Sequence, residues 1–155
     1  MRVFKVEARL AVIGTVFLAV LIMGGCATTI RYSYDTRTGF PGMKSYKWAP
    51  SWAVMSPQDS LLETNVQVLA EQFLEQKGFT KVPEKSDLLI SINYESEVGT
   101  SQYGYQLRML TLNIYKSEPK ELIWRGTASG SIYTDAASND LKDAVQGILS
   151  NFPPK

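Results

Sequence analysis

The sequence predicts an α+β domain with two layers, in which two amphipathic helices pack on a mostly antiparallel sheet of about five strands. Tyr105–Tyr115 and Leu122–Tyr133 are long strand candidates around a short turn with Pro119, a pattern typical of a hairpin. One apolar helical stripe precedes the last three strand candidates and another follows them. The elements therefore run strand, strand, helix, three strands, helix.

A hydrophobic leader precedes this domain. Three basic residues lie within the first nine, an uncharged and largely apolar run covers Leu10–Met23, and Gly24-Gly25-Cys26 closes it. A basic head, an apolar run and small residues at a cleavage site are typical of a secretory signal. Because a cysteine follows the small residues, we expect a bacterial lipoprotein, cleaved between Gly25 and Cys26 and acylated on Cys26.

A membrane-spanning helix is the alternative interpretation of the leader. Leu10–Met23 reaches only about 21 Å as a helix, against roughly 30 Å of hydrocarbon. The charge-free stretch Leu10–Ile30 is longer, but Gly24-Gly25 and Thr28-Thr29 weaken its second half. We therefore expect residues 1–25 to be removed, 26–30 to form a lipidated cysteine and short tether, and 31–155 to form a single domain.

Composition excludes several functions. Three of the 16 basic and one of the 15 acidic residues precede Cys26, which leaves the mature chain a net charge of about −1. Nucleic-acid binding needs a basic surface, so none is expected. Histidine, the commonest metal ligand and proton shuttle, is absent, and Cys26 is the single cysteine. We expect no metal, no cofactor, no disulfide and no enzymatic activity.

The first half of the domain contains two short strands and a helix. Arg31–Asp35 and Met43–Ala49 alternate aromatic with polar residues, as half-buried strands do. Ser56 followed by a proline begins the helix, and Gly78 ends it after about Lys77. Its predicted buried stripe contains Leu62, Val66, Leu69 and Phe73.

The second half contains three strands and a closing helix. Leu88–Glu95 alternates apolar and polar residues and precedes a Gly- and Ser-rich connection at 99–104. The hairpin strands follow, around the turn Lys116–Glu121. The closing helix has an apolar stripe over 141–149 and stops at Asn151 and the Pro153-Pro154 pair.

Aromatic residues near the start of the domain form a candidate surface for a partner or ligand. They are Tyr32, Tyr34, Tyr46, Trp48 and Trp52. Such rings suit a groove for lipid or glycan, or the bilayer interface. The alternative is that two adjacent short strands pack these rings into the core.

Trp124-Arg125-Gly126 is the best-defined internal motif. Arg125 beside an aromatic ring is a candidate anion or partner site. The alternative places Trp124 in the core, Arg125 outward by strand alternation, and Gly126 where a bulge or another backbone approaches.

Four acidic residues are the candidates for a hydrolase with paired carboxylates: Asp35, Asp59, Glu63 and Asp87. Acid–base work needs two carboxylates in one cleft with separated pKa values. These residues fall at strand ends, a helix start and a turn, where capping explains them. No nucleophile elbow, phosphate loop or metal-spaced cluster accompanies them.

The mature chain resembles the bacterial lipoproteins built on domain of unknown function 4136. The matching stretches are Tyr34-Asp35 with Phe40 and Lys44–Trp48, then Gln76–Phe79, Ser86–Ile90, Leu122–Ala128 and Val145–Pro154. The turn Lys116–Glu121 departs from the longer glycine-containing turn of many members. The resemblance implies this fold and an envelope location. It assigns no activity.

These observations predict a lipid-anchored, non-catalytic accessory or interaction module, joined to a membrane by acylated Cys26. Ala27 in place of Asp implies, by resemblance to enterobacterial lipoproteins, the outer membrane facing the periplasm. An envelope protein bound through a sheet edge or loop is the expected partner. The alternatives are a carrier of a small apolar ligand, lipid or glycan, between helices and sheet, and an unfamiliar hydrolase. Buried side chains filling the interlayer space would exclude the carrier.

Overall fold

The computed structural model describes residues 28–50, 57–96, 106–135 and 138–154. Gly25, Cys26, Trp52 and Ser56 lie outside these ranges. The described elements are β1 (Thr29–Tyr34), the 3-10 helix η1 (Phe40–Gly42), β2 (Ser45–Trp48), α2 (Pro57–Gln76), β3 (Thr80–Lys81), β4 (Leu88–Ser96), β5 (Gln106–Lys116), β6 (Glu121–Tyr133) and α3 (Asp140–Ser150). No helix among them combines the length and apolar character needed to cross a membrane.

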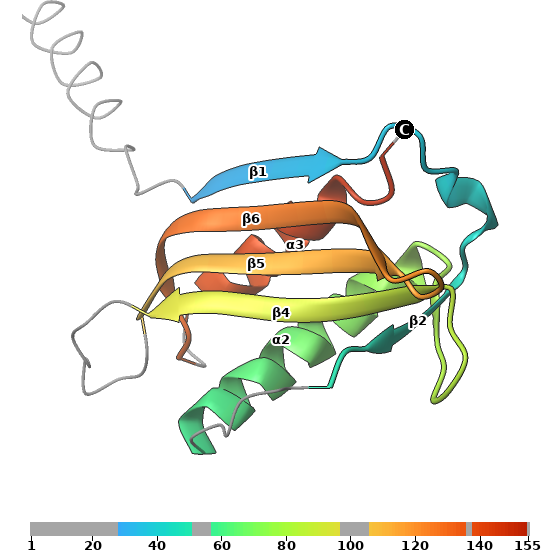
Figure 1. Ribbon diagram of the computed structural model, residues 1–155. Coiled ribbons are helices and arrows are strands. Elements are labelled where there is room, and N and C mark those ends of the chain that lie inside the picture. Colours follow the sequence, from blue (N-terminus) through green and yellow to red (C-terminus); the bar gives the residue numbers. More distant parts are fainter. Residues whose placement is uncertain (1–27, 51–56, 97–105, 136–137, 155) are drawn as a thin grey trace, which may run out of the picture.

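The strands form one open sheet in the order β1-β6-β5-β4-β2-β3 (Figure 1). The fold class is confirmed, since β1, β6, β5 and β4 are antiparallel neighbours. The described sheet has six strands rather than about five, because Thr80–Lys81 adds a short parallel partner to β2. β2 also runs parallel to β4, and α2 supplies the crossover that a parallel pair requires.

The two short strands near the start of the domain are not adjacent. β1 pairs with β6 at one edge, whereas β2 lies beyond β4 near the other. The interpretation of their aromatic residues as one packed group is therefore wrong. Strand order depends on long-range pairing, which local alternation does not encode. β1 also begins at Thr29, so Thr29 and Ile30, expected in the tether, pair with Ser129 and Ala128.

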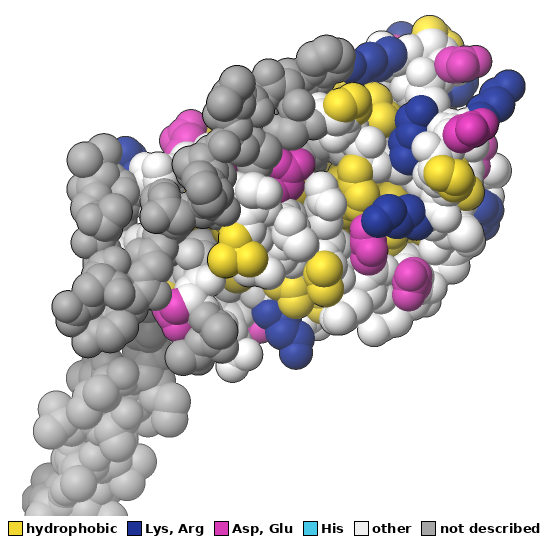
Figure 2. All heavy atoms as spheres, turned by 90° about the horizontal axis from the view of Figure 1, so that it is seen from below, with side chains coloured by type: hydrophobic (Ala, Val, Ile, Leu, Met, Phe, Trp, Pro, Cys, Tyr) yellow, Lys and Arg dark blue, Asp and Glu magenta, His cyan; other side chains and the backbone are white. Residues whose placement is uncertain are grey.

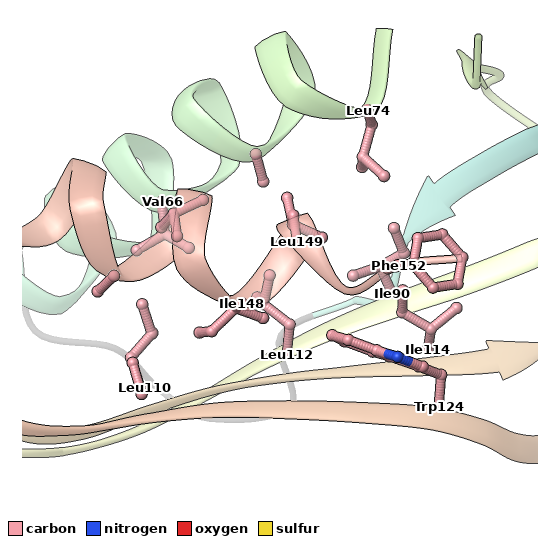
Figure 3. Packing of buried hydrophobic residues seen from close by; sticks show 14 of the residues in the cluster. Val66, Leu74, Ile90, Leu110, Leu112, Ile114, Trp124, Ile148, Leu149 and Phe152 are labelled. Atoms are coloured by element: carbon pink, nitrogen blue, oxygen red, sulfur yellow. The ribbon is translucent and has the colours of Figure 1, made fainter. Parts of the chain in front are cut away.

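Both helices cover the same face of the sheet (Figures 1 and 3). Ile90 of β4 is paired with Ile114 of β5, and Ile114 is paired with Trp124 of β6. The three side chains therefore lie side by side on that face. Ile148 and Leu149 descend from α3 onto them, and all five are at most 1% exposed. The core therefore lies between α2, α3 and one face of the sheet, and no described helix lies on the other face.

The buried stripe of α2 differs from the predicted one. Leu62, Val66, Ala70 and Leu74 are buried, while Leu69 and Phe73 are only partly buried. The stripe follows four-residue steps because α2 also packs against α3.

Gly78 ends α2 as expected. Its φ of 82° lies in the left-handed region, where glycine has no Cβ to clash. The N–H groups of Gly78 and Phe79 then donate to Glu75 and Leu74 carbonyls at 2.9 and 3.0 Å, which closes the helix.

Candidate functional site

The candidate surface residues of β1 lie on the outermost strand of the described sheet. Tyr32 and Tyr34 are 50% and 40% exposed, and their rings stack with centroids 6.4 Å apart. Both alternate with Arg31 and Ser33 along the strand, and both are paired to helix-side residues of β6, Gly126 and Trp124. The two rings therefore form an exposed aromatic ledge on the helix side of the edge.

A chain of ring contacts fixes this ledge to the core. Tyr34 meets Phe40 of η1 edge-on at 6.3 Å, and Phe40 meets Phe152 at 6.0 Å. Phe152 then contacts both Trp124 and Phe79 at 5.3 Å. The edge-to-face pairs among these, which are all but the tilted Phe79–Phe152 pair, each add about 0.5–1.5 kcal/mol beyond the area they bury. The ledge is therefore held by the fold, although its outer rings face solvent.

Tyr46 and Trp48 belong to a different part of the molecule. Tyr46 is completely buried, which removes its side chain from the candidate surface. Burial, and secondarily the charges of Glu71 and Glu75, raises the pKa of the Tyr46 hydroxyl to about 12. Its Oη has no hydrogen-bond partner within the described part of the chain.

Trp48 joins β2 to α2. Its Nε1 donates to Glu71 Oε1 at 2.8 Å, and the same oxygen accepts from Lys81 Nζ of β3 at 2.5 Å. Trp48 therefore attaches one end of the sheet to a helix. Trp52, the fifth aromatic residue of the candidate surface, lies outside the described residues.

Arg125 faces outward on the helix-free side of the sheet. Its Nε donates to Asn113 Oδ1 at 2.7 Å, and Asn113 Nδ2 donates to Asn93 Oδ1 at 2.7 Å. Asn113 is only 4% exposed, although no described helix lies on this face. The bonds run across β4, β5 and β6, and they leave the rest of the exposed guanidinium facing solvent.

Trp124 is 1% exposed, in agreement with the structural interpretation of the Trp-Arg-Gly motif. Gly126 is required by side chains rather than by a backbone or bulge. A Cβ at this position would lie 2.2 Å from Trp124 Cη2 and 2.7 Å from Ile148 Cγ2. The motif therefore packs α3 on the sheet and turns Arg125 to the opposite face.

The acidic candidates have structural partners. Asp35 accepts from Arg37 Nε at 3.0 Å, and this bond lowers the pKa of the Asp35 carboxyl. Asp87 Oδ2 accepts from the Lys44 and Ser45 N–H groups, both at 2.9 Å, and these bonds lower its pKa. Both shifts oppose the raised pKa of a general acid at neutral pH.

Asp59 and Glu63 both lie in the first turns of α2, and Glu63 accepts from Gln67 at 3.3 Å. Over the described ranges, no group of three or more His, Cys, Asp or Glu residues is placed to hold a metal ion.

Buried side chains fill the space between the helices and the sheet (Figure 3). Among the residues that decide whether a carrier cavity exists, Leu62, Ile90, Leu112, Trp124 and Ile148 are each at most 4% exposed, and Phe73 packs against them. This packing disfavours a ligand between the layers.

Sequence reasoning missed three residues that shape these surfaces. Phe40 lies between the two predicted short strands and Phe152 lies after the closing helix, yet both are buried and connect the ledge to the core. Asn113 is a buried polar residue of β5, where its neighbours Leu112 and Ile114 are also buried. A buried amide in such a strand is the signal that indicates a polar network on the opposite face.

Comparison with known proteins identifies the fold and the family. Residues 30–154 match the family described as Domain of unknown function (DUF4136). No curated protein matches the sequence. A solved PDZ domain protein from Parabacteroides distasonis is similar, with a TM-score of 0.61 and 16% identity over 83% of this chain. This chain spans only 36% of that protein's length.

This chain matches two other solved structures over almost their full length. The PelC dodecamer from Paraburkholderia phytofirmans gives a TM-score of 0.56 and 14% identity over 80% of this chain and 96% of that one. A DUF4136 family protein from Bacteroides thetaiotaomicron gives a TM-score of 0.55 and 12% identity, over 81% of this chain and 94% of that one. Identities this low show a shared fold and nothing about activity. Because the family match covers residues 30–154 of the 155-residue chain, this protein belongs to the DUF4136 family.

Proposed function

We propose that this protein is a lipid-anchored, non-catalytic interaction module of the bacterial cell envelope. The observation that carries the proposal is the leader: a basic head, an apolar run and small residues that end at Cys26. Acylation of Cys26 supplies the membrane anchor, and the outer membrane facing the periplasm is the location that Ala27 favours by resemblance to enterobacterial lipoproteins. An envelope protein is the proposed partner.

The start of β1 supports a close attachment to the membrane. Only Ala27 and Thr28 separate Cys26 from Thr29, the first residue of β1. Three residue steps span at most about 10 Å. Two or three acyl chains hold a protein durably, whereas one holds it marginally, since each buried methylene contributes about 0.8 kcal/mol. The anchor would therefore keep the Thr29 end of the domain beside the lipid headgroups.

The non-catalytic assignment is supported by the acidic residues and by the core. The ionised carboxylates of Asp35 and Asp87 accept hydrogen bonds from backbone N–H groups. This is a structural role typical of turns and strand ends. The interlayer space is packed with side chains, so the surface of the domain is the part left for binding.

Fatty-acid labelling tests the anchor. In an enterobacterial host, the full chain should incorporate an alkyne analogue of palmitate and lose residues 1–25 by intact mass. Cys26→Ser should abolish both, because no other thiol exists in the chain. Ala27→Asp is the matched control: it should keep the label but move the protein to the inner-membrane fraction. Unchanged labelling of Cys26→Ser, or a mature protein that retains the leader, would contradict the anchor.

A further inference from the structure

We propose that the free edge of β1 binds an extended segment of an envelope protein as an additional strand, and that this segment is apolar on one side and acidic on the other. The inference rests on the proposed function as an interaction module and names its binding surface and the chemistry of its partner. Strand addition of this kind uses main-chain hydrogen bonds for affinity and alternate side chains for specificity.

The backbone of β1 has one side available for pairing. Asp35 N–H donates to the Ile123 carbonyl at 3.0 Å, which extends the β1–β6 ladder by one residue. Along an antiparallel strand, successive residues direct their N–H and C=O groups to opposite sides. Residues of the same parity as Asp35 therefore bond to β6, and Ile30, Tyr32 and Tyr34 direct theirs away from the sheet.

The two edges of the sheet are built differently (Figure 1). The β3 edge is only two residues long, contains Lys81 and has Pro83 two residues beyond its end. Short strands, lysine and proline are the devices that protect an edge against pairing. β1 is six residues long, pairs with β6 without a register shift, and has a single charge, Arg31. Of the two outermost strands of the described sheet, β1 therefore has the longer edge.

The side chains of β1 specify what the added strand should present. The aromatic ledge of Tyr32 and Tyr34 lies on the helix side of the edge, and it favours apolar or aromatic partners there. On the opposite side, Arg31 and Arg125 are exposed, and neither forms an ion pair with a carboxylate in the described ranges. Two exposed cations beside one edge favour acidic residues on that side of the added strand.

The described part of the α2 side has a more mixed surface than the β1 edge. There, exposed hydrophobic side chains are interspersed with both signs of charge over the part of the face that Figure 2 shows in colour. A second copy of the chain is also a poor occupant of the β1 edge. Antiparallel pairing of two β1 strands would place their anchored ends at opposite ends of the pair, and it would add two more unpaired arginines to one face.

Selection from a displayed library of random twelve-residue peptides tests the proposal. The target is the mature acylated protein in detergent micelles. Enriched peptides should alternate apolar residues with Asp or Glu. On adding one of them, hydrogen exchange of the Ile30, Tyr32 and Tyr34 amides should slow at least tenfold. Arg31→Glu should weaken binding roughly fivefold, the effect of about 1 kcal/mol from one exposed charge pair.

Proline substitutions separate binding from folding. Tyr32→Pro should abolish peptide binding but leave the midpoint of thermal unfolding nearly unchanged, because the Tyr32 N–H faces away from β6. Ser33→Pro should lower that midpoint, since its N–H bonds to β6. Tyr32→Phe is the matched control and should bind normally.

Three outcomes would overturn the proposal: no enrichment of alternating acidic peptides, equal binding by Tyr32→Pro, or a dimer that Tyr32→Pro dissociates. The binding assay does not depend on where the protein resides in the cell, so its failure is distinct from a failure of the Cys26 labelling.

Discussion

Replacing Gly126 with alanine should destabilise the domain more than any other single methyl addition to the described glycines. The added Cβ would lie 2.2 Å from Trp124 Cη2, 2.7 Å from Ile148 Cγ2 and 2.9 Å from Trp124 Cζ2. Carbon atoms in ordinary contact lie about 3.5–4.0 Å apart. The Trp124 ring must therefore move by more than an ångström.

The size of the loss in stability depends on what surrounds the Trp124 ring. Trp124 is 1% exposed, and Phe152 meets it with centroids 5.3 Å apart, so the ring cannot turn into open space. Overpacking of a buried core costs about 1–3 kcal/mol. Because the group that must move is rigid and enclosed, we expect a loss of about 3 kcal/mol. In a domain of this size that loss should lower the unfolding midpoint by about 10 °C.

Urea unfolding followed by Trp fluorescence and circular dichroism measures the effect. Gly39→Ala is the matched control, since nothing lies within 4 Å of its Cβ position and its φ of −85° suits alanine. It should change the free energy of unfolding by at most about 0.5 kcal/mol. Adding Trp124→Phe removes the two closest ring atoms, and no hydrogen bond is lost because Trp124 Nε1 has no partner in the described chain.

The double variant decides whether the clash is the cause. If the ring opposes the new methyl group, Gly126→Ala should cost at least about 1 kcal/mol less in the Trp124→Phe background than in the wild type. Additivity of the two substitutions within about 0.5 kcal/mol would refute the reasoning. A neutral Gly126→Ala would refute it as well.

Three further substitutions test the polar contacts. Asp87→Ala should cost about 1 kcal/mol at neutral pH, since water replaces part of the lost bonds at this exposed carboxylate. Because folding lowers the Asp87 pKa below 3.8, that contribution is fully present above this value and is lost as the pH falls through the lower folded pKa. The variant and wild-type urea midpoints should therefore converge in acid. Glu71→Gln should weaken the bonds from Trp48 and Lys81 and lower the unfolding midpoint by a few degrees, measured by circular dichroism. Asn113→Ala should cost about 1–2 kcal/mol in urea unfolding and leave Arg125 without its bond, while Asn93→Ala, at an exposed position, should cost less.

Local pattern was sufficient for the long elements of the fold. β5 and β6 alternate over many residues around a short turn, so both their type and their pairing were predictable. α2 and α3 have apolar stripes and clear end signals, of which Gly78 is confirmed by its positive φ. β3 was missed because two residues carry no periodicity.

The candidate site was less predictable because burial depends on neighbours far away in the sequence. Tyr32 and Tyr46 are the same residue type in similar short alternating strands. Tyr32 is 50% exposed because β1 is the last strand of the sheet, whereas Tyr46 is completely buried between the sheet and α2. Only the strand order, which is set by long-range pairing, distinguishes them.

The proposed anchor and the proposed binding edge together restrict where a partner can lie. In an extended chain, Ile30 is within about 14 Å of the Cys26 position and Tyr34 within about 28 Å. With Cys26 acylated, every outward N–H group of β1 therefore lies within roughly 30 Å of the lipid headgroups, whatever the tilt of the domain. A partner that adds a strand must present its extended segment in that same layer. A short tether thus favours a binding segment that is itself close to a membrane, because a segment deep in the periplasm could not reach the edge.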